Sequence, residues 1–341
     1  MRPLWTYRTT SAFVSSPSVF DGCVYFVSVA GEIFCLRIAD GTLVWKTSTF
    51  AETRSTPALT PNGLFIADYG SVIWSFNPKS GSVNWRKIHD AAIFSSPLIY
   101  EDQLFVGDAK GDFYALLLSG EVGWRFAAGG EINSSACCND RNVYFGSDDY
   151  QLYCLDKQSG REVWHKQTDF WVTSTPAYHA GDLFVGSLSA MLKLDALSGE
   201  ILWRYDTQSE IESSPAVTSN YVVFGGFDHH IYCLERQSGK VVWKFQTEDI
   251  VFSSPSVHGG LVFVGGYDGV FYALDLHTGE VIFRFPGCSV ISASPAIAQG
   301  KVFIGGEDGI ARCFEFQRGA VVSDWPMFRG NSSRTGFSLL G

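Results

Sequence analysis

The chain has 341 residues, of which 15% are aromatic and 18% charged, and it contains 35 glycines. This composition suits short strands joined by tight turns and argues against a disordered chain, which would be poor in aromatic residues. The net charge of −10 disfavours binding to nucleic acid or to an anionic membrane surface. Because no apolar run reaches the roughly 18 residues that span a bilayer, we expect no membrane insertion.

The first predicted element is a strand over residues 3–9. Its sequence, Leu4-Trp5-Thr6-Tyr7-Arg8-Thr9, matches residues 202–207, and Trp5 lies 40 residues before Trp45. The segment has no apolar core of the kind found in a secretory signal. We therefore expect a cytoplasmic protein, or a periplasmic one if a leader has been removed.

From this strand onward the sequence repeats with a period of 39 or 40 residues, which is typical of propellers and solenoids. A Ser/Thr-Pro step recurs at Pro17, Pro57, Pro97, Pro176, Pro215, Pro255 and Pro295, and Ala136 holds the same place in the fourth copy. A turn glycine recurs at Gly41, Gly81, Gly120, Gly160, Gly199, Gly239, Gly279 and Gly319. An aromatic residue follows it at Trp45, Trp85, Trp124, Trp164, Trp203, Trp243 and Phe283. Three features that stay in phase over eight copies indicate eight structural repeats.

The seventh copy shows the four strands of a repeat most clearly. The sequence predicts strands that begin at Ser253, cover Leu261–Gly266 and Val270–Leu276, and cover Glu280–Phe285. Asp268-Gly269 between the middle two is a hairpin turn signal. The middle strands are apolar on both faces, which indicates sheets buried on both sides, as in stacked propeller blades.

The eighth copy ends at Gly319 without an aromatic fourth strand, and the first strand of the chain can supply it. We therefore predict an all-β fold over residues 1–319: an eight-bladed β-propeller of four-stranded antiparallel blades, in which residues 3–9 close the last blade. Trp5 and the seven repeat aromatics should dock between adjacent blades. Residues 320–341 form a C-terminal tail that we expect to pack on the rim of the propeller.

These repeats resemble the pyrroloquinoline-quinone-like (PQQ-like) repeat family. Tyr272-Ala273-Leu274-Asp275 followed by Thr278-Gly279-Glu280 matches its consensus nearly letter for letter. The family includes quinone-dependent alcohol dehydrogenases and also cofactor-free scaffolds, such as the propeller lipoprotein of the outer-membrane barrel assembly machinery. The resemblance therefore implies the fold but not one function.

The eight cysteines give little support to redox chemistry. Cys35, Cys154, Cys233 and Cys313 share one repeat position that other copies fill with Ser75, Ala115, Lys193 and Ala273, so we interpret it as a packing position. Quinone-dependent dehydrogenases of the family carry a vicinal disulfide, but Cys137-Cys138 falls inside an innermost strand, where adjacent side chains face opposite sides. We expect no disulfides.

No spaced set of metal ligands is evident, so we expect no metal site and no catalytic residues. The two histidines of Asp228-His229-His230 are adjacent, diverge in a strand, and fit a hairpin turn better than a metal site. Among cofactors we expect none, with PQQ and calcium as the alternative that the family implies.

The segments that enter the innermost strands are the least repetitive part of each copy, and in a propeller they converge at one mouth of the central channel. They carry Glu52, Arg54, Glu131, Asn133, Trp171, Glu210, Glu212 and Asp249. Variable polar loops on a regular scaffold are where binding usually occurs. The alternative interpretation is an ordinary solvated rim.

These observations favour a monomeric, non-catalytic propeller that binds a protein, a peptide or a neighbouring domain through the channel mouth. The alternative is a quinoprotein-type enzyme, or a sensor that binds PQQ or another small ligand at the same mouth. Against it, the loops are too short to enclose a cofactor.

Overall fold

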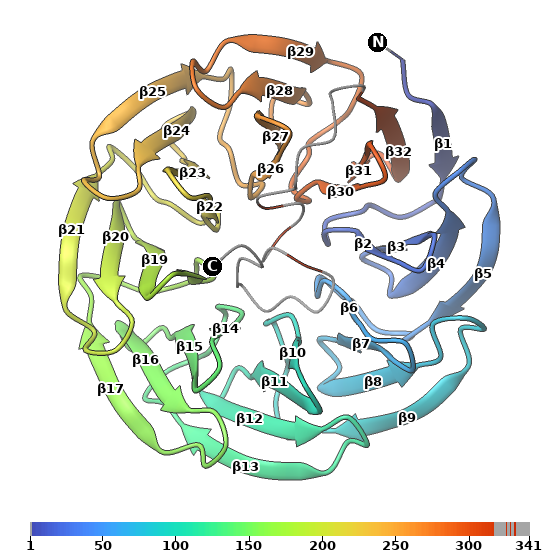
Figure 1. The fold of residues 1–341 in the computed structure, drawn as a ribbon. Helices are drawn as coiled ribbons and strands as arrows, with labels where there is room; N and C mark the ends of the chain where they lie inside the picture. The colour runs from blue at the N-terminus through green and yellow to red at the C-terminus, as the bar shows by residue number, and fades with distance from the viewer. Residues whose placement is uncertain (1, 317–324, 326–327, 329–330, 332–341) are drawn as a thin grey trace.

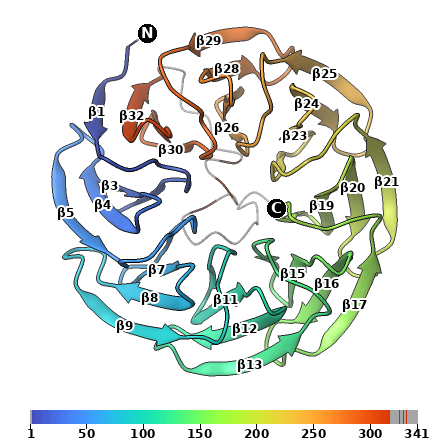
Figure 2. The same ribbon diagram turned by 180° about the vertical axis from the view of Figure 1, so that it is seen from behind.

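In the computed structural model, which describes residues 2–316, 325, 328 and 331, eight four-stranded antiparallel sheets form a closed ring (Figure 1). Blade 1 comprises β2–β5, the following blades continue in chain order, and blade 8 comprises β30–β32 with β1. Figure 2 shows the same ring of blades from the opposite side. The predicted all-β, eight-bladed propeller is confirmed.

The strands of each blade run from the channel to the circumference. The innermost strands are β2 (Ser18–Phe20), β6 (Ala58–Leu59), β10 (Leu98–Tyr100), β14 (Cys137–Cys138), β18 (Ala177–His179), β22 (Ala216–Val217), β26 (Ser256–His258) and β30 (Ala296–Ala298). The second strands are β3 (Cys23–Val27), β7 (Leu64–Ala67), β11 (Gln103–Gly107), β15 (Asn142–Gly146), β19 (Asp182–Ser187), β23 (Tyr221–Gly225), β27 (Leu261–Gly265) and β31 (Lys301–Gly305).

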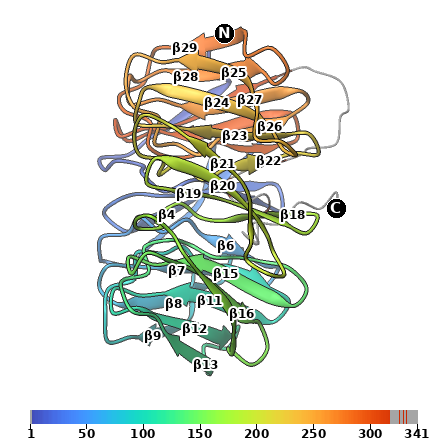
Figure 3. The same ribbon diagram turned by 90° about the vertical axis from the view of Figure 1, so that its left-hand side faces the viewer.

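The third strands are β4 (Glu32–Arg37), β8 (Val72–Phe76), β12 (Asp112–Leu117), β16 (Gln151–Asp156), β20 (Ala190–Asp195), β24 (His230–Glu235), β28 (Phe271–Asp275) and β32 (Ile310–Glu315). The outer strands are β5 (Leu43–Ser48), β9 (Val83–Ile88), β13 (Val122–Ala127), β17 (Glu162–Gln167), β21 (Ile201–Asp206), β25 (Val241–Gln246), β29 (Val281–Phe285) and β1 (Trp5–Arg8). Viewed edge-on, the ring is a thick disc with turns on both faces (Figure 3).

The core lies between neighbouring blades. The second and third strands are buried on both faces, and their side chains form separate clusters, such as the one that joins Trp5, Phe34 and Phe303 across blades 8 and 1. Cys35, Cys154, Cys233 and Cys313 are buried in four different clusters. This is the packing position that the repeats predicted, although Lys193 fills it in blade 5 with a buried ammonium 2.9 Å from Asp182.

The N-terminal strand closes the ring as predicted. β1 pairs antiparallel with β32, with Trp5 opposite Cys313 and Arg8 opposite Ile310. The first and last strands of the propeller thus lie side by side in Figure 1. Because β1 completes blade 8, the edge of β32 is paired. Closing the ring in this way protects a sheet edge that would otherwise be exposed.

Seven repeat tryptophans each link one blade to the next. The indole N–H of Trp203 donates to the carbonyl of Arg236 at 3.0 Å, and six other tryptophans make the equivalent bond at 2.8–3.2 Å. Each ring also lies on the turn glycine of the next blade. A Cβ built on Gly239 would lie 2.8 Å from the Trp203 ring. Glycine is therefore required here for two reasons: it lets the indole approach closely, and it adopts a positive φ of 68°.

The predicted tail, residues 320–341, lies mostly outside the described residues, as does the domain boundary at 319. Trp325 is described, and its backbone pairs with Val257 of β26 at the inner edge of blade 7. This contact lies on the inner side of blade 7, and the packing of the tail as a whole stays a prediction. No helix of the described part of the chain is long and apolar enough to cross a membrane.

Candidate binding site at the mouth of the central channel

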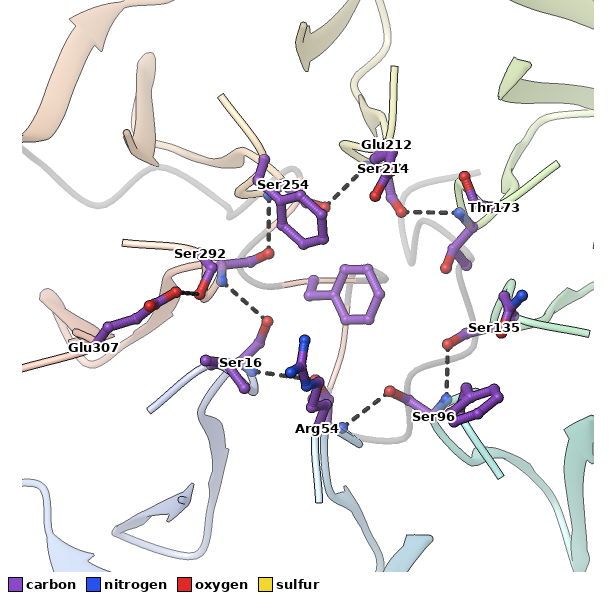
Figure 4. Close-up of a pocket in the computed structure, with 18 of the residues that line it drawn as sticks. Ser16, Arg54, Ser96, Ser135, Thr173, Glu212, Ser214, Ser254, Ser292 and Glu307 are labelled. Carbon is purple, nitrogen blue, oxygen red and sulfur yellow. Dashed lines mark hydrogen bonds between the residues drawn. The ribbon is translucent and has the colours of Figure 1, made fainter. Parts of the chain in front are cut away.

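A cavity of about 430 Å³ opens at the channel mouth, where all eight blades contribute side chains. It is formed by the segments that lead into the innermost strands, which converge in Figure 4. The hairpins between the second and third strands contribute Tyr69, Tyr267 and Glu307. The cavity is therefore lined largely by the segments that carry the candidate residues, and binding at this place stays a prediction.

The floor of the cavity is a ring of hydroxyl groups from the residue before the repeat proline or, in blade 4, before Ala136. These residues are Ser16, Thr56, Ser96, Ser135, Thr175, Ser214, Ser254 and Ser294. In seven cases the backbone N–H of one blade donates to the hydroxyl of the next blade, at 2.9–3.2 Å. The bond from Ser294 to Ser16 joins the last blade to the first (Figure 4). These bonds fix the radius of the channel.

Above the hydroxyl ring, one repeat position carries a different side chain in almost every blade. Three residues before the proline stand Val14, Arg54, Phe94, Asn133, Thr173, Glu212, Phe252 and Ser292, and all eight line the cavity. We call them the variable layer. The residue just before each is buried between blades, as for Ile132, Ile211 and Val251. Because side chains alternate along an extended chain, this anchor turns the variable residue towards the channel.

The alternation decides which of the predicted site residues line the cavity. Arg54, Asn133 and Glu212 belong to the variable layer and line the main cavity. Trp171 and Glu210, two residues earlier in the repeat, line a smaller depression of about 60 Å³ that Thr173 and Glu212 also share. The remaining three, Glu52, Glu131 and Asp249, line neither hollow.

Two of these residues are held by carboxylates beside the cavity. Arg54 donates to Glu52 at 3.2 Å, and both side chains are exposed. The amide of Asn133 donates to Asp148 at 2.8 Å. Burial raises the pKa of Asp148, whereas the bond from Asn133 opposes that rise.

The carboxyl group of Glu212 is poorly hydrated. It is partly buried, and this loss of hydration raises its pKa, with the nearby Glu210 raising it further. A carboxylate whose ionised form is disfavoured is more often found at binding sites than on solvated rims. Glu212 therefore adds an argument for binding that its residue type alone did not give.

The sequence prediction missed the aromatic part of the mouth. Phe94 and Tyr69 are in edge-to-face contact at 4.7 Å between ring centroids, and the rings of Phe252 and Tyr267, both from blade 7, lie 6.0 Å apart. Both phenylalanines stand in the variable layer, so the repeat alignment contained the signal. Of the aromatic residues at the mouth, the sequence prediction included only Trp171.

The other candidate motifs lie apart from this cavity. Cys137 and Cys138 are buried in β14 and pack into different clusters, on opposite faces of the sheet. His229 occupies a turn with a φ of 64°, and a ring nitrogen of His230 lies 2.7 Å from the Asp228 carbonyl oxygen. Within the described residues no three His, Cys, Asp or Glu side chains are grouped as metal ligands.

Eight blades that share a Ser/Thr-Pro step, a turn glycine and an outer-strand aromatic residue, with few exceptions, define the class of the protein as an eight-bladed β-propeller of PQQ-like repeats. The chain belongs to the family described as outer membrane protein assembly factor BamB, whose model matches residues 2–125, 117–226 and 188–336. The family resemblance read from the repeats is thereby confirmed.

Two curated relatives of the chain are named for different functions, one as an assembly factor and one as an enzyme. BamB of Legionella pneumophila (strain Paris) is 26% identical over 132 residues, covering 38% of this chain and 34% of that protein. A polyvinylalcohol dehydrogenase of Pseudomonas sp is 29% identical over 170 residues, covering 43% of this chain and 22% of the enzyme. The matches thus span about a third or less of each relative. A crystal structure of BamB from Moraxella catarrhalis superimposes with a TM-score of 0.80 at 16% identity, covering 91% of this chain and 98% of that one, which shows the shared fold.

The mouth does not fit the quinone cofactor that the dehydrogenase branch of the family implies. PQQ carries three carboxylates and is held together with a calcium ion, which needs six to eight oxygen ligands. The charged side chains that line the cavity are Arg54, Glu212 and Glu307. One guanidinium and two carboxylates would repel such an anion more than they would hold it, and no ligand cluster of the described residues would keep the calcium.

Proposed function

We propose that the chain is a non-catalytic propeller scaffold that binds an extended segment of a protein partner, or of a neighbouring domain, at the channel mouth. The observation that carries this proposal is the contrast between two adjacent layers of the same cavity. The hydroxyl ring is nearly uniform from blade to blade, whereas the variable layer directly above it carries apolar, aromatic, basic, acidic and neutral polar side chains. A uniform scaffold that presents a diverse, inward-facing layer is suited to recognise one particular sequence of side chains.

Exposed apolar groups around the mouth support a protein partner over a small ligand. Phe50 is 89% exposed and Trp171 is 46% exposed, although both belong to segments that converge on the mouth face. Large exposed aromatic side chains mark protein interaction sites more often than solvated rims. The relatives named as assembly factors are consistent with such a role.

Site-specific photo-crosslinking tests the proposal in cells. A benzoylphenylalanine replaces Phe94 or Phe252, which lie in the cavity, or Leu197, which is 76% exposed in a turn on the opposite face and serves as the control. We expect both mouth positions to capture the same protein and the Leu197 position not to capture it. Capture of that protein from Leu197 alone would contradict the proposal.

A further inference from the structure

The inner edge of blade 7 is already paired with another part of the chain. The N–H of Val257 in β26 donates to the carbonyl of Trp325 at 2.8 Å, and the N–H of Trp325 donates back to Val257 at 3.1 Å. This is an antiparallel bridge on the side of β26 that faces the channel. An innermost strand presents there the same unpaired backbone groups as any edge strand, which can accept a further strand.

The side chain of Trp325 makes this contact more than a backbone bridge. It is 2% exposed, and it belongs to the apolar cluster that Val217 of blade 6 and Val257 of blade 7 also share. A buried indole removes a large apolar surface from water, on the order of 200 Å². The inner surface of blades 6 and 7 therefore accommodates a tryptophan from a segment that is remote in sequence.

The same segment reaches the mouth cavity. Phe328, three residues after Trp325, is among the side chains that line it, together with Phe252 and Tyr267 of blade 7. The strand edge and the cavity are thus two parts of one surface, since a single short segment contacts both.

We propose that the inner edge of β26, with the adjoining indole pocket, is a docking site for an extended segment that carries a tryptophan, and that its occupant is the C-terminal segment around Trp325. The tail acts as a tethered ligand whose affinity comes from the buried indole and from the two backbone hydrogen bonds. Tethering gives such a ligand an effective concentration in the millimolar range, so the site stays filled in the intact chain. This inference rests on the contacts of β26 and does not require the proposed function.

Competition in trans tests the occupancy. A labelled peptide of residues 320–333 is titrated into the full chain and into its Trp325→Ala variant, with fluorescence anisotropy as the readout. We expect the peptide to bind the variant at least tenfold more tightly than the intact chain, because the variant has lost its own occupant. The same peptide with alanine for tryptophan should not bind. The Leu197→Ala chain is the control, since this exposed side chain lies in a turn on the opposite face of the propeller, and it should behave as the intact chain does.

Amide exchange in the unmodified chain gives an independent readout. Val257 and Val217 hold the same register position in β26 and β22, opposite Val262 and Val222, but only Val257 has a described bridge on its inner side. In valine-labelled protein we expect the Val257 amide to exchange at least tenfold more slowly than that of Val217. The Trp325→Ala substitution should abolish this difference. Equal exchange of the two amides in the intact chain, or equal peptide binding by the intact chain and the variant, would overturn the proposal.

Discussion

A chain that lacks residues 1–9 is expected to aggregate or to lose its cooperative thermal transition. The deletion removes β1, so the backbone groups of β32 from Ile310 to Cys313 lose their partners. It also removes Trp5, which is 8% exposed and whose indole donates to the carbonyl of Ile38 in blade 1 at 3.1 Å. Loss of a buried tryptophan alone costs about 3–5 kcal/mol, a large part of the 5–15 kcal/mol by which domains are typically stable.

The deletion is compared with a chain that begins at Leu4 and therefore keeps β1 complete. Size-exclusion chromatography and a thermal melt of both proteins decide the outcome. The shorter deletion should remain monomeric with the melting temperature of the full chain. If the chain without residues 1–9 did the same, the ring would not depend on closure by its first strand.

The second large effect is expected at the repeat tryptophans. Trp203→Ala should destabilise the protein by about 3 kcal/mol. The substitution removes the indole ring that packs on Gly239 and the hydrogen bond from the indole N–H to the Arg236 carbonyl. Trp203→Phe should cost only about 1 kcal/mol, the typical net value of one hydrogen bond. Phe283 shows that the equivalent position of blade 7 functions with an aromatic ring that has no N–H.

Denaturant unfolding monitored by circular dichroism measures both substitutions. The phenylalanine variant is the control that separates ring packing from hydrogen bonding. Equal and negligible shifts for the two variants would mean that this indole does not hold blades 5 and 6 together.

The fold could be predicted almost completely because each blade repeats the same strands, turns and packing positions. The strand boundaries of blade 7 agree with the sequence prediction to within a few residues; the main difference is that Ser253 and Ser254 precede β26 instead of belonging to it. The reason is local: the N–H of Ser254 bonds to the Ser294 hydroxyl of the next blade, and Pro255 has no N–H to give to a ladder.

The site could be predicted only as a region. The sequence indicated segments that line the cavity, but residue type alone does not say which side chains turn inward. Arg54 and Glu212 line the main cavity whereas Glu52 and Glu210, two positions earlier, do not. The buried residue between the members of each pair sets this direction. The contact between Trp325 and Val257 could not be foreseen, since the tail has no counterpart among the repeats.

Binding of the captured partner to three purified chains tests the central claim most directly. The first is the unmodified chain. The second combines Arg54→Glu with Glu212→Lys in the variable layer. The third combines Arg161→Glu with Glu200→Lys, two exposed residues at the outer-strand turns of the opposite face. Surface substitutions of this kind usually change stability by less than about 0.5 kcal/mol, so all three should melt alike.

Isothermal titration calorimetry should show at least a tenfold weaker affinity for the mouth variant and an unchanged affinity for the variant of the opposite face. The unmodified chain should show no binding of PQQ with or without calcium. Equal partner affinity for all three chains, or micromolar binding of PQQ, would contradict a scaffold that recognises proteins through its channel mouth.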